Sequence, residues 1–260
     1  MTHPYFGGAG GPRILAHRGL VTPDAAAQGI VENSFAAVAA AHAAGIEYVE
    51  SDCHLTSDGT VVLFHDADLR RVTGDPRRID QVALRELELI MAHRGGLITL
   101  AQALDSFPET RFNIDVKAED AAAPAGRIVA PHAERVLLTS FSLRRRRAAL
   151  AAAVSARAGL MPATSGSLGD VARVLCALWS GSASLVRRSL TGVDALQVPE
   201  KQGIVRVVTP RLVRAAHRAG VEVHVWTVND AAEMIKLVDL GVDGIVTDRS
   251  DVALTTFAGR

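Results

Sequence analysis

Short apolar runs alternate with longer runs of helical period along this 260-residue chain, and the alternation narrows the folds open to it. The short runs are nearly continuous in apolar residues, as is typical of strands buried on both faces of a parallel sheet. Counting the second strand and its extension as one unit, eight strands are predicted over 13–19, 48–56 with 60–66, 111–117, 135–141, 156–162, 195–199, 222–228 and 244–248.

Helical periods fill most of the intervals between these strands. Helices are predicted over 33–44, 99–107, 142–153, 168–179, 210–219 and 230–240. Eight β/α units in one chain of this length predict a (β/α)8 barrel of the TIM type, with 1–260 as a single domain. The segment 66–98 is long for a connection and indicates a small insertion after the second strand, whereas 118–134 is rich in Ala and Pro and its helix is doubtful.

An open doubly wound sheet is the alternative. Such a sheet usually carries a Gly-rich phosphate loop after its first strand. The first strand here ends in His17-Arg18-Gly19 instead, so the barrel is favoured.

The charge balance and the apolar pattern exclude several classes of protein. The 28 basic residues equal the 28 acidic ones, so no net field favours nucleic acid or an anionic membrane. No run reaches the roughly 18 apolar residues of a membrane helix, and residues 1–12 lack the features of a signal peptide. We therefore expect a cytoplasmic protein without stable membrane association, whose two cysteines, Cys53 and Cys176, are buried free thiols.

Polar residues follow the predicted strands at their C-terminal ends, the end at which barrels assemble active sites. Residues two apart on a strand share a face. Glu50 and Asp52 therefore point the same way, as do Asp115 and Lys117. Converging carboxylates repel one another unless a cation neutralises them, and hard oxygen ligands suit Mg²⁺ or Ca²⁺.

Cationic and titratable side chains at the same end complete a phosphoryl-transfer pattern. Arg18 and Lys117 are candidate ligands of an anionic substrate. His17 and His65 lie on different strands and could serve as general acid and base on either side of a phosphorus. Taken singly, each of these residues more often belongs to a solvated face or a surface ion pair, and Trp226 more often to a core; their joint placement favours a site.

These stretches together resemble the glycerophosphodiester phosphodiesterase family over residues 14–251. The matching stretches are Ala16-His17-Arg18-Gly19, Glu32-Asn33-Ser34, Glu50-x-Asp52, Leu55-Thr56-x-Asp58-Gly59, His65-Asp66, Asn113-x-Asp115-x-Lys117, Val225-Trp226-Thr227-Val228-Asn229 and Gly241-Val242-Asp243-Gly244-Ile245-Val246-Thr247-Asp248.

The resemblance implies a metal-dependent hydrolase that cuts small glycerophosphodiesters to sn-glycerol 3-phosphate and an alcohol. It implies His17 and His65 as the acid–base pair and Arg18 and Lys117 on the phosphate. It also implies a divalent cation, Mg²⁺ or Ca²⁺ with Mn²⁺ as a further candidate, on a set of three carboxylates: Glu50, Asp52 and Asp115. We further expect Trp226 to bind substrate by offering an apolar wall to the glycerol carbons.

The chain departs from the family at three places. The third metal ligand is commonly Glu and here is Asp115, Ser34 replaces the usual Thr, and the loop 20–31 is longer than usual beside the predicted mouth. The role of Glu32 stays open, with orientation of Arg18 as one possibility. Two other functions are considered: a phosphodiesterase of the lysophospholipase D type acting on a larger lipid, and a binding barrel without catalysis.

Overall fold

Eight parallel strands form the centre of the computed structural model, which describes residues 2–7, 10–157 and 159–259. They lie in the order β6-β5-β4-β2-β1-β11-β10-β7, and a parallel bridge from Ser165 to Ala195 joins the two outer strands, so the sheet nearly closes into a barrel. The predicted (β/α)8 fold is confirmed. The strands are β1 (Arg13–His17), β2 (Tyr48–Leu55), β4 (Arg111–Val116), β5 (Val136–Thr139), β6 (Ala163–Thr164), β7 (Ala195–Pro199), β10 (Glu222–Trp226) and β11 (Gly244–Thr247).

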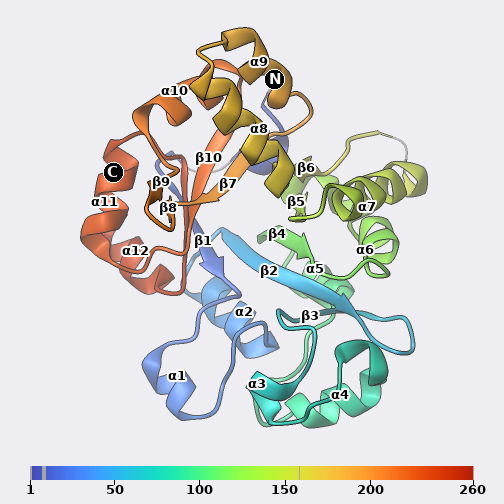
Figure 1. Cartoon of the computed structure of the whole chain (residues 1–260). Helices are drawn as coiled ribbons and strands as arrows, with labels where there is room; N and C mark the ends of the chain where they lie inside the picture. The colour runs from blue at the N-terminus through green and yellow to red at the C-terminus, as the bar shows by residue number, and fades with distance from the viewer. Residues whose placement is uncertain (1, 8–9, 158, 260) are drawn as a thin grey trace.

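Helices surround the strands (Figure 1). Several begin where a Ser, Thr or Asp side chain accepts a hydrogen bond from a backbone N–H of the first turn, as Ser34, Thr99, Ser142, Thr209 and Asp230 do. The helices of the ring are α2 (Phe35–Ala43), α5 (Leu100–Ser106), α6 (Ala122–Val129), η3 (Ala130–Arg135), α7 (Leu143–Ala156), α8 (Leu168–Trp179), α9 (Ala183–Ser189), α10 (Pro210–Arg218), α11 (Ala231–Asp239) and α12 (Ser250–Phe257).

Three additions project from the loops of the barrel. The long loop 20–31 contains α1 (Pro23–Ala27), and the connection after β7 forms a small hairpin of β8 (Lys201–Gln202) and β9 (Val205–Arg206). The insertion after the second strand starts with β3 (Val61–Leu63), antiparallel to β2, and buries its own apolar cluster. It continues through α3 (Arg70–Thr73), η2 (Ile79–Gln81) and α4 (Leu84–Met91).

Three expectations from sequence need correction. The strand predicted at 156–162 is instead β6, two residues at Ala163–Thr164, because the Ala-rich helix α7 continues to Ala156. The doubtful helix within 118–134 forms as α6. Cys176 is exposed on α8, whereas Cys53 is buried as expected.

The inside of the barrel is built from side chains that alternate along the strands. Arg13, Leu15 and His17 lie on one face of β1, so one strand supplies the N-terminal end, the middle and the C-terminal end of the interior. At the N-terminal end a short helix, η1 (Pro4–Phe6), inserts Tyr5 and Phe6 beneath the apolar cluster that contains Leu15. This end is closed, so a ligand would enter from the other end.

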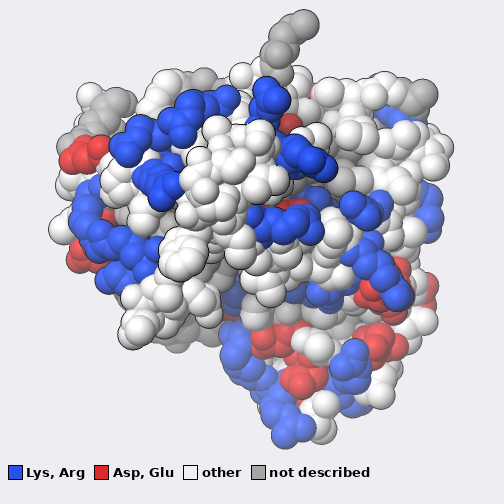
Figure 2. Space-filling model, turned by 45° about the horizontal axis from the view of Figure 1, so that its top comes forward, with Lys and Arg blue, Asp and Glu red and all other residues white. Residues whose placement is uncertain are grey.

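Charged side chains are mixed over the surface in view. Figure 2 shows basic side chains interspersed with uncharged surface, and acidic ones lying mostly in the lower part of the view beside basic neighbours. Among the described residues, none of the helices has the length and apolar character needed to span a bilayer.

Candidate active site

A cavity of about 210 Å³ opens at the C-terminal ends of the strands. All eight residues that the sequence singled out line it, and they come from five strands or their following loops. They are His17, Arg18, Glu50, Asp52, His65, Asp115, Lys117 and Trp226.

The strand register explains why these side chains meet. His17 of β1 lies beside Glu50 of β2, and Asp52 of β2 lies beside Asp115 of β4. Because neighbouring parallel strands in register point alternate side chains to the same face, each pair projects into the cavity. The expected common direction of Asp115 and Lys117 is observed, since Lys117 Nζ donates to Asp115 Oδ2 at 2.7 Å.

A tight turn after β1 aims Arg18 at the site. Arg18 has φ of 63° and Gly19 has φ of 89°, both in the left-handed region. A side chain at position 19 would collide with the backbone of Ala37, because its Cβ would lie 2.6 Å from the Ala37 carbonyl carbon. Only glycine fits there, and the turn returns the Arg18 guanidinium to Asp52, with Nε 3.2 Å from Oδ2.

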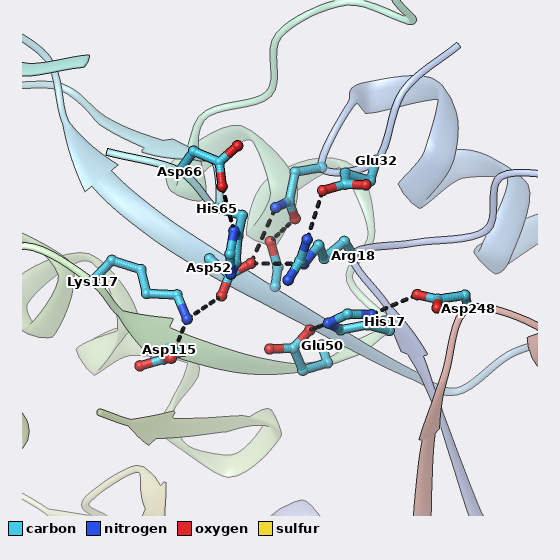
Figure 3. A network of polar contacts seen from close by, with 12 residues as sticks. His17, Arg18, Glu32, Glu50, Asp52, His65, Asp66, Asp115, Lys117 and Asp248 are labelled. Carbon is cyan, nitrogen blue, oxygen red and sulfur yellow. Dashed lines mark hydrogen bonds and ion pairs between the residues drawn. The ribbon is translucent and has the colours of Figure 1, made fainter. Parts of the chain in front are cut away.

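Each histidine is held by a carboxylate at Nδ1. His17 Nδ1 is 2.6 Å from Asp248 Oδ1, and His65 Nδ1 is 2.7 Å from Asp66 Oδ1. The hydrogen bond from His17 lowers the pKa of Asp248, which therefore stays ionised beside the ring. With Nδ1 engaged in this way, Nε2 of each ring is the nitrogen left to act in the cavity, and His17 Nε2 lies 3.9 Å from Glu50 Oε2 (Figure 3).

An ion-pair chain links Arg18 to His65 through two loops. Glu32 Oε1 accepts from Arg18 Nη1 at 2.6 Å and from Arg71 Nη2 at 2.7 Å. Arg71, in α3 of the insertion, also donates from Nε to Asp66 Oδ2 at 2.6 Å. Glu32 thus does orient Arg18, one of the possibilities left open by sequence, and the insertion contributes Arg71 to the same network.

The three acidic side chains of the cavity share too few cationic partners. Lys117 Nζ lies 2.9 Å from Asp52 Oδ1 and donates a hydrogen bond to Asp115. Among the described residues, however, Glu50 Oε2, Asp115 Oδ1 and Asn113 Oδ1 are buried without a hydrogen-bond partner. Burial and the charges of Asp52 and Asp115 raise the pKa of Glu50 well above its usual range. Burial likewise raises the pKa of Asp115, although Lys117 opposes the rise.

Unpartnered buried carboxylate and amide oxygens fit a hard cation, because buried polar atoms otherwise find partners. Within residues 2–7, 10–157 and 159–259, no three His, Cys, Asp or Glu side chains form a ready-made metal-binding group. The ammonium of Lys117 lies between Asp52 and Asp115, so these two carboxylates are already paired with a cation. The metal set Glu50, Asp52 and Asp115 stays a prediction, with Asn113 as an additional oxygen that sequence did not propose.

The remaining walls of the cavity differ in polarity. The rings of Phe141 and Trp226 meet edge to face at 5.9 Å between centroids and form an apolar wall. A second part of the wall is polar and consists of Thr139, Ser165 and Gln197 at the strand ends. Thr139 Oγ1 lies 2.5 Å from Ser165 Oγ, and Ser165 Oγ donates to Gln197 Oε1 at 3.1 Å. These hydroxyl and amide groups suit a substrate that carries hydroxyls.

Roles for Asp66, Asp248, Asn113 and Arg71 were not predicted from sequence. The first three stand in the stretches that resemble the family, so the sequence did point to them. Asp66 follows His65, Asp248 ends the last strand, and Asn113 precedes Asp115 by two residues. Arg71 carried no signal, because its partners lie 5 and 39 residues away and only the fold brings them together. His54 Nε2 lies 3.2 Å from the backbone oxygen of His65.

A model of one protein family matches residues 17–252 of this chain, and its description is the glycerophosphoryl diester phosphodiesterase family. Among curated proteins, the chain is 35% identical over 255 residues to the probable glycerophosphodiester phosphodiesterase 2 of Mycobacterium tuberculosis, covering 96% of this chain and 92% of the relative. It is 24% identical to a lysophospholipase D of Rattus norvegicus, covering 91% of this chain and 83% of the relative.

Solved structures share the fold. A glycerophosphodiester phosphodiesterase of Thermotoga maritima superposes with a TM-score of 0.69 at 22% identity, covering 95% of this chain and 99% of the other. A phosphodiesterase of Oleispira antarctica, solved with its product sn-glycerol 3-phosphate, superposes with a TM-score of 0.70 at 22% identity, covering 94% and 96%.

Proposed function

Because the chain belongs to the glycerophosphoryl diester phosphodiesterase family, we propose that its cavity hydrolyses glycerophosphodiesters to sn-glycerol 3-phosphate and an alcohol. The observation that carries the proposal is a pair of histidines, each held at Nδ1 by a carboxylate, in a cavity that also presents Arg18 and Lys117. A phosphodiester needs such a set: cations for its charge, a base for water and an acid for the leaving alcohol.

His17 and His65 are the acid–base pair of this proposal. Asp248 and Asp66 favour the tautomer with the proton on Nδ1, so the neutral ring offers Nε2 as an acceptor. One ring takes a proton from the attacking water, and the other, protonated, gives a proton to the alcohol oxygen as its bond to phosphorus breaks. The assignment of acid and base between the two is left open.

Arg18 and Lys117 hold the phosphate group. Arg18 is oriented by Glu32 and Asp52, so its planar donors are fixed before the substrate arrives. Lys117 is 22% exposed at its side chain, and the carboxylates of Asp52 and Asp115 keep its pKa raised despite its burial, so it remains a cation. The preset positions concentrate positive charge where the phosphate oxygens bind.

Glu50, Asp52 and Asp115 would hold a divalent cation, with Asn113 Oδ1 as a further oxygen. The buried oxygens of Glu50, Asp115 and Asn113 that lack a hydrogen bond support this set, and Mg²⁺, Ca²⁺ and Mn²⁺ all accept oxygen ligands. When bound, such a cation supplies Lewis-acid polarisation of a phosphoryl oxygen. Lys117 must then share Asp52 and Asp115 with the cation.

The apolar wall of Phe141 and Trp226 would pack against the glycerol carbons, while Thr139, Ser165 and Gln197 would meet its hydroxyls. One feature favours a larger lipid as an alternative substrate. Phe141 is 50% exposed at the edge of the cavity, and its carbonyl accepts from the backbone of Leu168, which is 65% exposed, so the rim there is apolar. A lysophospholipase D-type activity would place an acyl chain on this rim.

A substrate panel tests the proposal. The purified protein is incubated with glycerophosphocholine, glycerophosphoethanolamine and lysophosphatidylcholine, first with a chelator and then with Mg²⁺, Ca²⁺ or Mn²⁺ restored. Release of glycerol 3-phosphate from the two small diesters, only with metal, is expected. Faster turnover of lysophosphatidylcholine would favour the lipid alternative, and activity undiminished by chelation would contradict the metal set.

Asp115→Asn tests the metal set directly. Titration calorimetry with Mn²⁺ should show at least about tenfold weaker binding, because a carboxylate ligand is lost. Asp120→Asn, a change of the same kind at an exposed position nearby in sequence, is the control and should bind as the unaltered protein does. Unchanged affinity in Asp115→Asn would reduce Asp115 to an ion-pair partner of Lys117.

A further inference from the structure

Part of the chain contains basic residues and no acidic ones, although the charges of the whole chain balance. Residues 171–193, which span most of α8 and all of α9, and residues 207–221, which span α10, together contain six arginines and no Asp or Glu. These helices lie at the top of Figure 1, and when that top is turned forward in Figure 2, basic side chains predominate in the upper part of the view. The fold therefore gathers positive charge on one side of the barrel.

Most of these arginines have no carboxylate partner. Arg173 pairs with Asp170 on the same helix, but the other five are exposed and form no ion pair with any described residue. They are Arg187, Arg188, Arg211, Arg214 and Arg218. By contrast, Arg77 and Arg78 of the insertion are each bonded to an aspartate two residues away. The guanidinium donors on α9 and α10 remain available for an anionic ligand.

A cleft of about 400 Å³ lies among α8, α9 and α10. Arg211 and Arg218 line it from α10, where their seven-residue spacing places them on one face of the helix. Arg187 lines it from α9. Two further lining residues, Leu178 and Val186, are buried and give the cleft an aliphatic floor. The cleft thus combines unpaired guanidinium groups with apolar surface, and its described lining contains no acidic residue.

Two large apolar side chains next to the cleft are exposed. Trp179 at the end of α8 is 93% exposed and follows Leu178, and Leu185 of α9 is 45% exposed and precedes Val186. Exposed Trp and Leu beside arginines are typical of surfaces that enter the boundary of a bilayer, where guanidinium groups meet lipid phosphates. Nucleic acid fits less well, because Trp179 is the only Phe, Tyr or Trp of residues 171–193 and 207–221 that could stack on a base.

We propose that the surface formed by α8, α9 and α10 binds an anionic phospholipid bilayer, with a lipid phosphate in the cleft. Arg187, Arg211 and Arg218 would hold that phosphate as two-pronged donors, and Trp179 and Leu185 would enter the bilayer boundary. This peripheral contact departs from the expectation of no membrane association, which was based on the total charge. The cleft shares no lining residue with the catalytic cavity, so the proposal stands independently of the proposed hydrolysis.

Sedimentation with vesicles tests the proposal on the whole protein. Vesicles of phosphatidylcholine alone are compared with vesicles of equal parts phosphatidylcholine and phosphatidylglycerol. The unaltered protein should sediment with the anionic vesicles and not with the neutral ones, and its binding should weaken in high salt because exposed charges are screened. Equal sedimentation with both kinds of vesicle, or none with anionic vesicles at low salt, would overturn the inference.

Paired substitutions test whether the cleft is the binding surface. Arg211→Gln combined with Arg218→Gln should weaken binding to anionic vesicles about tenfold or more, since each basic residue near such a membrane contributes about fivefold. The control combines Arg85→Gln with Arg127→Gln, which removes the same charge from exposed positions on α4 and α6 and should weaken binding less than about twofold. An unchanged thermal unfolding midpoint verifies that both variants fold. Equal losses of binding in the two variants would contradict the proposal.

Three further measurements separate a bilayer from other ligands. Trp179→Ser should weaken binding to anionic vesicles about three- to tenfold, because the indole loses its apolar contact with the bilayer. Inorganic phosphate should displace the protein from vesicles no more than sodium chloride of equal ionic strength does, and a DNA duplex should bind more weakly than the vesicles. Full binding by Trp179→Ser, specific displacement by phosphate, or tighter binding to DNA would each overturn the inference.

Discussion

The two ends of the barrel interior both contain polar clusters that are largely shielded from solvent, and they differ in whether their charges are paired. At the N-terminal end, Arg13 of β1 donates two hydrogen bonds to Glu222 of β10, at 2.8 and 2.7 Å, and His224 contacts the same carboxylate at 3.0 Å. At the C-terminal end, Glu50 Oε2 and Asp115 Oδ1 are buried and accept no hydrogen bond from the residues that the structure describes.

The pKa values of one glutamate at each end, Glu222 and Glu50, show this difference. Burial raises the pKa of both, but the hydrogen bonds from Arg13 and His224 outweigh it for Glu222 and lower its pKa to about 2. Within the described part of the chain, no donor comes within hydrogen-bond distance of Glu50 Oε2, and the neighbouring carboxylates Asp52 and Asp115 raise the pKa of Glu50 beyond the effect of burial. A buried cluster whose charges are satisfied by the protein stabilises the fold, whereas one left unsatisfied is suited to receive a ligand.

The largest expected effect breaks the function of the C-terminal end alone. His65→Ala, and separately His17→Ala, should lower kcat by about 10²–10⁴-fold, since each ring moves a proton in the transition state. The thermal unfolding midpoint should change little, because both rings are partly exposed. Saturating metal and substrate exclude a binding defect, and near-normal turnover of His65→Ala would remove it from the acid–base pair.

A change of similar size should break the N-terminal end without touching the chemistry. Arg13→Leu leaves the largely shielded carboxylate of Glu222 without its main partner and should destabilise the fold by up to about 3–5 kcal/mol. Urea unfolding measures the loss, and kcat of the remaining folded protein should stay within about twofold. Arg77→Leu removes an exposed pair with Asp75 and is the control, which should unfold as the original does. Equal stabilities would mean that the paired cluster contributes nothing.

Lowering the pH should remove the stability that the ionised Glu222 contributes at the N-terminal end. The pKa of Glu222 is lowered from 4.5 to about 2 by folding, so the unfolded chain binds this proton more readily. The ionised carboxylate thus contributes about 3 kcal/mol above about pH 5, and this contribution disappears as the pH falls toward about 2. In urea titrations at neutral pH and at two pH values between about 3 and 4, the stability difference between the original protein and Glu222→Gln should narrow as the pH falls. A constant difference would contradict the assignment.

The smallest expected effect is a change in stability of opposite sign at the two ends. Glu50→Gln replaces a buried carboxyl group, whose ionised form is opposed by burial and by Asp52 and Asp115, with a neutral amide. It should stabilise the metal-free protein by about 1 kcal/mol, while hydrolysis is lost. Differential scanning fluorimetry in the presence of a chelator measures the midpoint, and Glu222→Gln in the same assay should lower it. A lower midpoint for Glu50→Gln as well would mean that both ends are equally satisfied by the protein.

Local pattern was sufficient where a segment's own residues decide its structure. The apolar run of β7 and the amphipathic run of α8 have the bounds predicted from sequence, and the alternation of Asp115 and Lys117 on one strand face required only the two-residue period of a strand. The strand β6 was misplaced because it is only two residues long, at Ala163–Thr164, and is defined by its neighbours rather than by its own composition.

The tertiary structure decided which charges find partners. β1 and β11 are neighbours only because the barrel brings the two ends of the chain together, and that adjacency places Asp248 at His17, 231 residues away. Arg71 reaches Glu32 across 39 residues for the same reason. The sequence alone determined the fold class and the residues gathered at one end of the barrel, because periodicity is local. Burial and the pairing of charges depend on contacts between distant segments, which no local pattern encodes.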